Sequence, residues 1–286
     1  MKNIVFFICC LVFTSKTLAQ NLIPFKIYSA SGKPVSEKYF FKKLSQSNII
    51  LFGELHDNSI AHWLQLKLVK QLHTKNQVIV GMEMFETDNQ EFLNQYLSKQ
   101  ISVKQLDSLG RLWNNFKTDY QPLVDYCKEN NLPVIASNIP RRYASLLFKQ
   151  GEQALLNLPD TDKQWFPSLP MPYDESLPAY TAMLKMFGDP IHANKNFPKS
   201  QAIKDYTMAT NILKHYQNHA IFVHLNGSYH SNNFEGIYWY LKHFEPNLRV
   251  VTIATVLQAD LNKLDLENKN IADFIIVIDM DMTRTY

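Results

Sequence analysis

The stretch Asn48–His62, NIILFGELHDNSIAH, decides how the rest of the chain is interpreted. Its apolar run Ile49–Phe52 is bounded by Gly53 and polar residues, which is the pattern of a buried strand in a parallel sheet. Apolar residues then recur at helical spacing and predict a helix a few residues further on. Glu54 and His56 therefore stand at the carboxyl end of a strand, where open α/β sheets bind their ligands.

A second interpretation of the same residues is purely structural. Asp57 or Asn58 can cap the predicted helix by accepting hydrogen bonds from its first backbone N–H groups. The polar residues would then need no chemical role. The stretch by itself leaves a functional site and a helix cap as open alternatives.

The rest of the chain repeats the alternation of buried strand and amphipathic helix. This alternation predicts an α/β fold, in which a mostly parallel sheet carries helices on both faces. A proline- and aromatic-rich segment at about 150–200 breaks the alternation, and we interpret it as a helical insertion that forms a lid or an association surface. Helical periodicity also predicts a helix over 103–116. The further strands are expected at 25–28, 77–85, 132–137, 220–225, 249–254 and 274–278.

The first residues have the pattern of a secretory signal peptide. Lys2 precedes the apolar run 4–13, and small residues near Ala19 supply a cleavage site. The run is too short to span a bilayer permanently. We therefore expect residues 1–19 to be removed and residues 20–286 to form a single α/β domain, secreted across the inner membrane to the periplasm or the extracellular space.

The cysteines and the overall charge narrow the class of protein further. Cys9 and Cys10 lie within the signal peptide and follow bulky residues, so we expect no lipid anchor, and only Cys127 remains after cleavage. A formal net charge of +3 with 19% charged residues, and no basic run, argues against a nucleic-acid partner. The 18 Phe, 14 Tyr and 4 Trp exceed ordinary core needs and suit a flat apolar ligand.

Polar residues also follow the other predicted strands. Glu83 ends its strand as Glu54 does, and two carboxylates at neighbouring strand ends repel unless a metal, a proton or a cation lies between them. His230 follows the strand at 220–225. We expect Glu54, His56, Glu83 and His230 to meet in one crevice, with capped and solvated side chains as the alternative. Asn138 and His224 are further candidates for the same crevice.

Two arginines open a predicted helix after the strand at 132–137. Pro140 is favoured at the first helical position, and Arg141 and Arg142 follow it at the same edge of the sheet. They are candidates for holding an anion, and two solvated arginines are the alternative.

Together these motifs resemble the ChaN-like haem-binding family of the Tiki superfamily. The resemblance covers nearly all of the chain after residue 19, and although each motif is short, the ordered set is specific. The matching segments are Gly53–Asn58 with His62 and Gln65, Gly81–Phe85 with Gln90, Trp113 with Tyr120–Leu123, Ala136–Arg141, Gln201 with Asp205, Met208 and Ala209, and Asn226–Ser231 with Gly236.

The resemblance implies a secreted haem-binding protein of haem and iron uptake, with haem as its cofactor. It also implies a homodimer that sandwiches haem, and an outer-membrane haem receptor as a candidate partner. In the family a tyrosine of one subunit ligates iron, and a histidine of the other holds the propionates. No motif fixes these positions here, and we expect them in the insertion, at Tyr173, Tyr180 and His192. The absence of a lipoprotein cysteine departs from the family, so membrane anchoring does not carry over.

A tyrosine ligand has a chemical requirement. A phenolate is a hard anionic donor that suits ferric haem. Its pKa must be lowered from about 10 by a neighbouring cation or a hydrogen bond. Lys185 or Lys195 could supply that charge.

The wider superfamily suggests a different class of function. It includes metal-dependent proteases and erythromycin-esterase-like enzymes with a similar Gly-Glu-x-His signature. In a metal-dependent hydrolase, His56, Glu83 and His230 would hold a divalent metal such as Zn, Mn or Fe(II), or activate water. Glu54 would then be the general base. The two functions are not exclusive.

Overall fold

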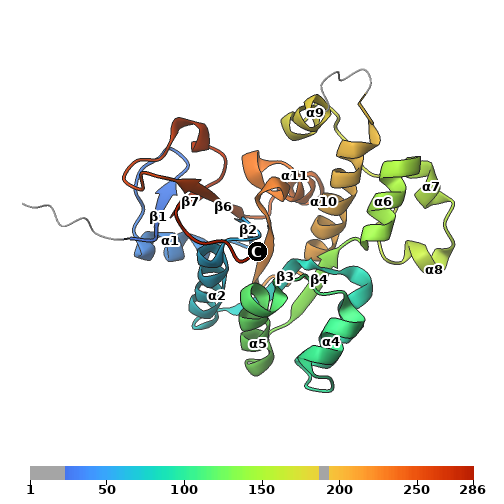
Figure 1. Cartoon of the computed structure of the whole chain (residues 1–286), viewed down its shortest axis with the longest axis horizontal. Coiled ribbons are helices and arrows are strands. Elements are labelled where there is room, and N and C mark those ends of the chain that lie inside the picture. The colour runs from blue at the N-terminus through green and yellow to red at the C-terminus, as the bar shows by residue number, and fades with distance from the viewer. Residues whose placement is uncertain (1–22, 187–192) are drawn as a thin grey trace, which may run out of the picture.

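The computed structural model describes residues 23–186 and 193–286, and these residues form one sheet of seven strands (Figure 1). The strand order is β1-β7-β6-β2-β5-β3-β4. β1 runs antiparallel to β7 at one edge, and every other neighbouring pair is parallel, which confirms the predicted sheet. The predicted signal peptide and His192 lie outside the described residues. The strands are β1 (Phe25–Ser29), β2 (Ile49–Glu54), β3 (Gln77–Glu86), β4 (Val134–Asn138), β5 (Ala220–Gly227), β6 (Val250–Gln258) and β7 (Phe274–Asp279).

The helices begin and end largely where the sequence patterns place them. Ser36 caps α1, and Asn58 caps α2 by accepting a hydrogen bond from the backbone N–H of Ala61 at 3.0 Å. No helix formed by the described residues has both the length and the apolar character needed to cross a bilayer. The helices are α1 (Glu37–Leu44), α2 (Ser59–His73), α3 (Gln90–Leu97), α4 (Val103–Gly110), α5 (Gln121–Glu129), α6 (Arg141–Gln150), α7 (Glu152–Leu156), α8 (Asp160–Lys163), α9 (Pro178–Lys185), α10 (Asn196–His215) and α11 (Ile237–Phe244).

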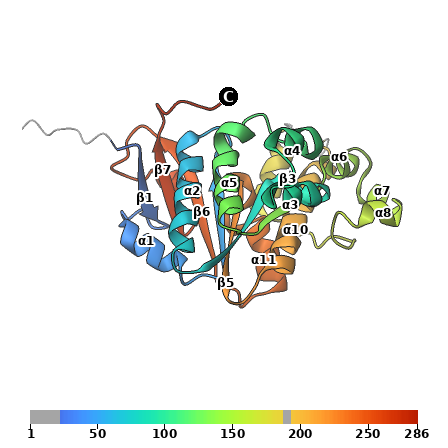
Figure 2. The same ribbon diagram turned by 90° about the horizontal axis from the view of Figure 1, so that it is seen from below.

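Helices cover both faces of the sheet because successive strand side chains point to opposite sides. Ile50 and Phe52 of β2 face the core under α1–α5, whereas Ile49 and Leu51 face the core under α6, α10 and α11. The two layers are visible from below in Figure 2, where α2 and α5 lie in front of the strands. β2, buried along its whole length, is therefore the scaffold on which both layers rest.

The helix predicted over 103–116 is shorter than expected. α4 ends at Gly110, because Arg111 adopts a left-handed conformation with φ of 50°. The guanidinium of Arg111 donates to Glu86 at 2.8 Å and to Asp88 at 2.5 Å, which holds this turn in place. The loop that follows carries Trp113 toward the carboxyl ends of the strands.

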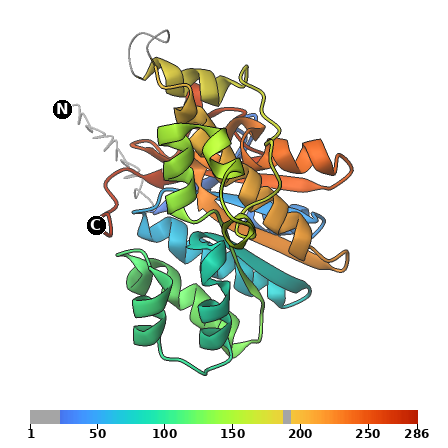
Figure 3. The ribbon, with the colours of Figure 1, turned by 90° about the vertical axis from the view of Figure 1, so that its right-hand side faces the viewer.

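The segment at about 150–200 is partly helical, as predicted. It contains α7, α8 and α9, and its aromatic side chains Phe166 and Tyr180 are buried against the core of α6, α10 and α11. In Figure 3 the yellow helix α9 of this segment lies at the opposite end of the molecule from the teal and green helices α3–α5, and its yellow-green part lies between them. Its role as a lid or an association surface stays a prediction.

Candidate functional site

The four residues predicted to meet at the sheet edge do lie together. Glu54 ends β2 and lies in register with Gly227 of β5, while Glu83 comes from β3 on the other side of β5. The sequence predicted that Glu54 and Glu83 would lie on neighbouring strands. Instead, β5 lies between their strands, and the two carboxylates flank Gly227 of β5. Glu54 pairs with His56 and Glu83 pairs with His230, so a histidine lies beside each of the two carboxylates.

Glu54 is buried and fully hydrogen-bonded. It accepts hydrogen bonds from His56 Nδ1 at 2.9 Å, from the Tyr120 hydroxyl at 2.6 Å, and from the side-chain amide of Gln65. Burial by itself would raise the pKa of Glu54, but the hydrogen bond from His56 and the charge of His62 lower it below the ordinary value. The ionised carboxylate fixes the orientation of the His56 ring.

A second layer of polar groups fixes the backbone of His56. Its carbonyl oxygen accepts hydrogen bonds from Asn115 Nδ2 at 2.9 Å and from His62 Nε2 at 3.1 Å. Asp119 in turn accepts a hydrogen bond from Asn115 at 2.7 Å and lies 3.4 Å from His62. The position of His56 is thus set from both sides.

His56 is the member of the cluster that solvent reaches. Its side chain is 35% exposed, whereas Glu54, Glu83 and His230 are buried. The imidazole packs edge-on against Trp113, with ring centroids 4.9 Å apart. Burial lowers the pKa of His56, but the hydrogen bond to Glu54 and the charge of Glu83 together raise it above its ordinary value.

The close approach of His56 requires Gly227. A Cβ atom at position 227 would lie 2.6 Å from His56 Nε2, which is closer than real Cβ contacts allow. The backbone N–H of Gly227 also donates to Glu83 at 2.7 Å. Gly227 therefore leaves space for the His56 ring, and it donates a hydrogen bond to Glu83, the carboxylate that pairs with His230.

His230 is buried between two carboxylates. Its Nε2 lies 3.1 Å from Glu83, and its Nδ1 lies 2.5 Å from Asp205 of α10. Burial opposes the charged imidazole, but the charges of Glu83 and Asp205 prevail and raise the pKa of His230 to about 10. Despite its burial, Glu83 has a pKa far below the ordinary value because of His230. His230 is therefore an imidazolium that donates from both nitrogens.

Among the residues that the structure describes, His224 and Asn138 make no recorded contact with the four cluster residues, and Asn138 instead lies opposite Glu86 in the pairing of β4 with β3. The ring nitrogens of His224 lie 2.8 Å from Ser137 Oγ and 3.1 Å from Asn226 Oδ1, and the residue is fully buried. Burial lowers its pKa to about 4, so the ring is neutral. The Asn138 side-chain oxygen is buried and has no hydrogen-bond partner among residues 23–186 and 193–286.

The predicted metal ligands do not fit a divalent cation in this arrangement. A histidine ligand must offer a lone pair, and both nitrogens of His230 are taken up by carboxylates. Within the part of the chain that the structure describes, no group of three His, Cys, Asp or Glu side chains is arranged to hold a metal.

The predicted haem ligands of the insertion form a separate pair. Tyr173 and Tyr180 stack with their ring centroids 5.2 Å apart. Tyr180 is buried, and its hydroxyl has no hydrogen-bond partner in the described ranges. Burial raises the pKa of both phenols, that of Tyr173 to about 12. Lys199 Nζ lies 5.6 Å from the centre of the Tyr173 ring, and a charge supplied by Lys185 or Lys195 stays a prediction.

For several residues of the site, the sequence alone does not indicate a role. Asp205 and Trp113 stood in the matching motifs, but nothing in their spacing paired them with His230 and His56. Tyr229 is not among the haem ligands predicted from the sequence, whose tyrosines lie in the insertion. Its side chain is 81% exposed, more than any other large hydrophobic side chain recorded for the described residues. The sequence feature that points to Tyr229 as a site residue is its position next to His230.

These observations define a class: an α/β protein with a paired histidine–carboxylate site at the carboxyl ends of a parallel sheet. The chain belongs to the family described as haem-binding uptake, Tiki superfamily, ChaN, whose model matches residues 40–241. This confirms the resemblance drawn from the motifs.

Solved structures confirm the fold. The structure of ChaN of Campylobacter jejuni, described as cofacial haem binding, is 19% identical with a TM-score of 0.65, and covers 89% of this chain and 97% of that chain. A Bacillus cereus protein is 12% identical with a TM-score of 0.51, covering 83% and 90% respectively.

One curated protein is also similar. The chloroplastic protein RETICULATA-RELATED 5 of Arabidopsis thaliana is 28% identical over an alignment of 153 residues, and the match covers 48% of this chain. The match spans only 20% of that plant protein's length.

Proposed function

We propose that this protein binds haem and acts in haem or iron uptake, as a dimer in which haem is sandwiched between subunits. Membership of the haem-binding ChaN family over residues 40–241 carries the proposal, and the cofacial haem of the Campylobacter jejuni relative supports it. The signal-peptide pattern of residues 1–19 adds a periplasmic or extracellular location without a lipid anchor. An outer-membrane haem receptor is the proposed partner.

The choice of iron ligand depends on which phenol a flat macrocycle can reach. The Tyr180 hydroxyl is covered, and Tyr173 is half-buried with a pKa raised to about 12, which disfavours its phenolate. Tyr229 projects from the turn Ser228–His230 with 81% of its side chain exposed. Tyr229 therefore fits an axial ligand best, and Tyr173, Tyr180 and His192 remain the proposed alternatives for contacts to haem. Bound haem would supply a ferric iron that accepts a phenolate oxygen.

Titration of the purified protein with hemin tests this function. We expect a saturable Soret band in the micromolar range. Tyr229→Phe should shift the band and weaken binding, whereas Tyr39→Phe, a substitution at an exposed tyrosine of α1, should leave it unchanged. In-line mass measurement should report a dimer with hemin. No saturable binding would end the proposal, and a shift seen only in Tyr173→Phe or Tyr180→Phe would move the ligand into the insertion.

Hydrolysis is a second candidate function, favoured by the accessible His56 beside the buried Glu54. In this arrangement His56 is the general base and Glu54 orients it, because Glu54 already accepts three hydrogen bonds. This reverses the role expected for Glu54. Ester and peptide substrates should be tested with protein purified without a His tag, alongside metal analysis. Activity lost in His56→Ala would support this function, and an inactive, metal-free wild type would remove it.

A further inference from the structure

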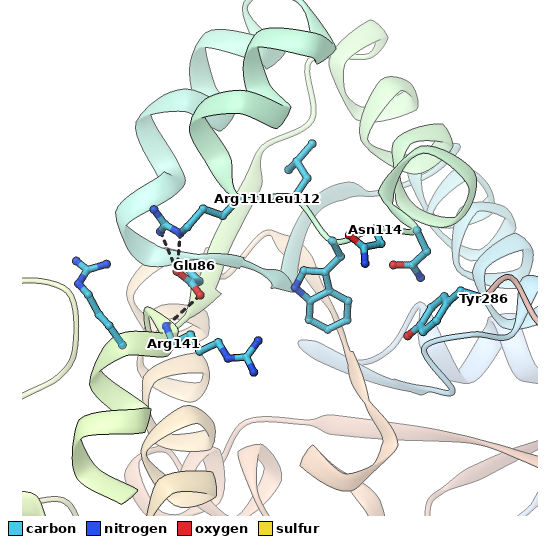
Figure 4. Close-up of a pocket in the computed structure, with 9 residues that line it drawn as sticks. Glu86, Arg111, Leu112, Asn114, Arg141 and Tyr286 are labelled. Atoms are coloured by element: carbon cyan, nitrogen blue, oxygen red, sulfur yellow. Dashed lines mark hydrogen bonds and ion pairs between the residues drawn. The ribbon is translucent and has the colours of Figure 1, made fainter. Parts of the chain in front are cut away.

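A pocket of about 600 Å³ opens beside the histidine–carboxylate cluster and is not part of it (Figure 4). A volume of this size lies within the usual range for small-molecule sites. In Figure 4, Arg111, Glu86 and Arg141 lie on one side of the pocket, and Asn114 and Tyr286 lie on the other. Trp113 and Asn115 also line it.

The charges around this pocket leave one cation without a counter-charge. Arg111 donates to Glu86 and Asp88, and Arg142 donates to Asp88 at 2.6 Å. The three arginine side chains face two side-chain carboxylates, Glu86 and Asp88, so the side-chain ion pairs leave one guanidinium over. Among residues 23–186 and 193–286, no ion pair of the Arg141 side chain is recorded, and the bond from this residue to Glu86 uses its backbone N–H at 3.0 Å. The guanidinium of Arg141 is thus available to an external anion.

The other walls of the pocket are aromatic and partly apolar. Trp113 is half-buried, and Leu112 and Tyr286 add further apolar surface. An indole presents a flat face on which a planar ligand can stack. A guanidinium opposite such a face selects ligands that carry an anion on a flat apolar body.

The pocket is also connected to His56. Trp113, which lines the pocket, packs edge-on against the His56 ring at 4.9 Å. Asn115, on the same wall, donates to the His56 carbonyl oxygen at 2.9 Å. A ligand held against Trp113 would therefore lie beside the accessible histidine.

We propose that this pocket binds a planar aromatic carboxylate, with Arg141 pairing with the carboxylate and Trp113 stacking on the ring. A single free guanidinium matches a monoanion, and this favours a carboxylate over a phosphate monoester. The proposal goes beyond haem binding, because it uses neither a tyrosine ligand nor a second subunit.

Calorimetric titration of the full chain with 2-naphthoate tests the proposal. We expect saturable binding by the wild type and a loss of about tenfold or more in affinity for Arg141→Met. The fold should survive this substitution, since the Arg141 side chain is exposed and its bond to Glu86 comes from the backbone. Lys149→Met, which removes a cation from the exposed side of the same helix, is the matched control and should bind as the wild type does.

Two further probes separate the parts of the proposal. The neutral 2-naphthamide should bind more weakly and should not respond to Arg141→Met, while Trp113→Leu should weaken both probes. Phenyl phosphate should bind no tighter than 2-naphthoate. The proposal is overturned by no saturable binding of 2-naphthoate up to about 10 mM, by equal affinity of Arg141→Met and wild type, or by a clear preference for the phosphate. None of these results depends on the outcome with hemin.

Discussion

The two histidine–carboxylate pairs of the site differ in burial and in charge balance. His56 is 35% exposed along its side chain and shares a hydrogen bond with one carboxylate, Glu54. His230 is buried and lies between Glu83 and Asp205. In both pairs, charge partners outweigh burial and raise the pKa of the imidazole, but only one of the rings remains accessible.

This difference assigns different roles to two residues that the sequence treats alike. A histidine whose two nitrogens donate to buried carboxylates is a fixed positive charge. The charge of His230 lowers the pKa of Glu83 below its ordinary value, whereas burial keeps the pKa of Asp205 above its own. A histidine with one oriented nitrogen and one accessible edge can exchange a proton or contact a ligand. The His230 pair therefore stabilises the site, and the His56 pair is where chemistry or ligand contact can take place.

Removing each histidine in turn should give the largest contrast. His230→Leu leaves Glu83 and Asp205 buried without a cation, and we expect it to lower the free energy of unfolding by about 3–5 kcal/mol. His56→Leu leaves Glu54 with its bonds from Tyr120 and Gln65 and should cost only about 1 kcal/mol. Urea unfolding at pH 6 measures both. Equal losses would show that the two pairs are equivalent.

Gly227 contacts both histidine–carboxylate pairs, so a single methyl group added at this position should lower the stability of the protein. In Gly227→Ala the new Cβ meets the His56 ring, and overpacking of this kind costs about 1–3 kcal/mol. The resonances of His56 should shift in NMR spectra. Gly110→Ala, whose Cβ would meet the side chains of Leu106 at 3.3 Å and Leu112 at 3.8 Å, is the control and should change stability by less than about 0.5 kcal/mol. An unshifted His56 in Gly227→Ala would argue against the close contact.

The pH dependence of stability should distinguish the His230 pair from the His56 pair without any large structural change to the protein. The folded-state pKa of His230, about 10, lies above its ordinary value of 6.5. Its contribution is therefore complete below about pH 6.5 and is lost as the pH rises toward 10, with a slope of at most about 1.4 kcal/mol per pH unit. Urea unfolding from pH 6 to 10 should show this decline in the wild type. The decline should be absent from His230→Gln, and its persistence there would assign it to another group.

Glu54→Gln should have the smallest effect on stability and a specific effect on His56. The amide keeps an oxygen acceptor, so we expect a loss of about 1 kcal/mol. The hydrogen bond and charge that raise the pKa of His56 disappear, so that pKa should fall. An NMR titration of the His56 ring measures it, with Tyr120→Phe as a control that keeps the carboxylate. An unchanged midpoint in Glu54→Gln would mean that Glu83, and not Glu54, sets the pKa of His56.

Local patterns in the chain determined the elements of the fold and the edge on which the site lies. Apolar runs ending in Gly53-Glu54 and Gly81-Met82-Glu83 predicted strands with carboxylates at their carboxyl ends. The structure confirms both strands and the position of Glu54 at the end of β2, whereas β3 continues past Glu83 to Glu86. The cap at Asn58 was also predictable, because a cap depends only on neighbours in the chain. These features follow from residues that lie close together in sequence.

The tertiary structure decided which partners each site residue has. β5, more than a hundred residues along the chain from β2 and β3, lies between them and places Gly227 against both His56 and Glu83. Asp205 reaches His230 from α10, and Trp113 reaches His56 from the loop that follows the end of α4 at Arg111. Strand order and burial depend on the packing of the whole chain, and they determine which histidine is an enclosed cation and which is an accessible group.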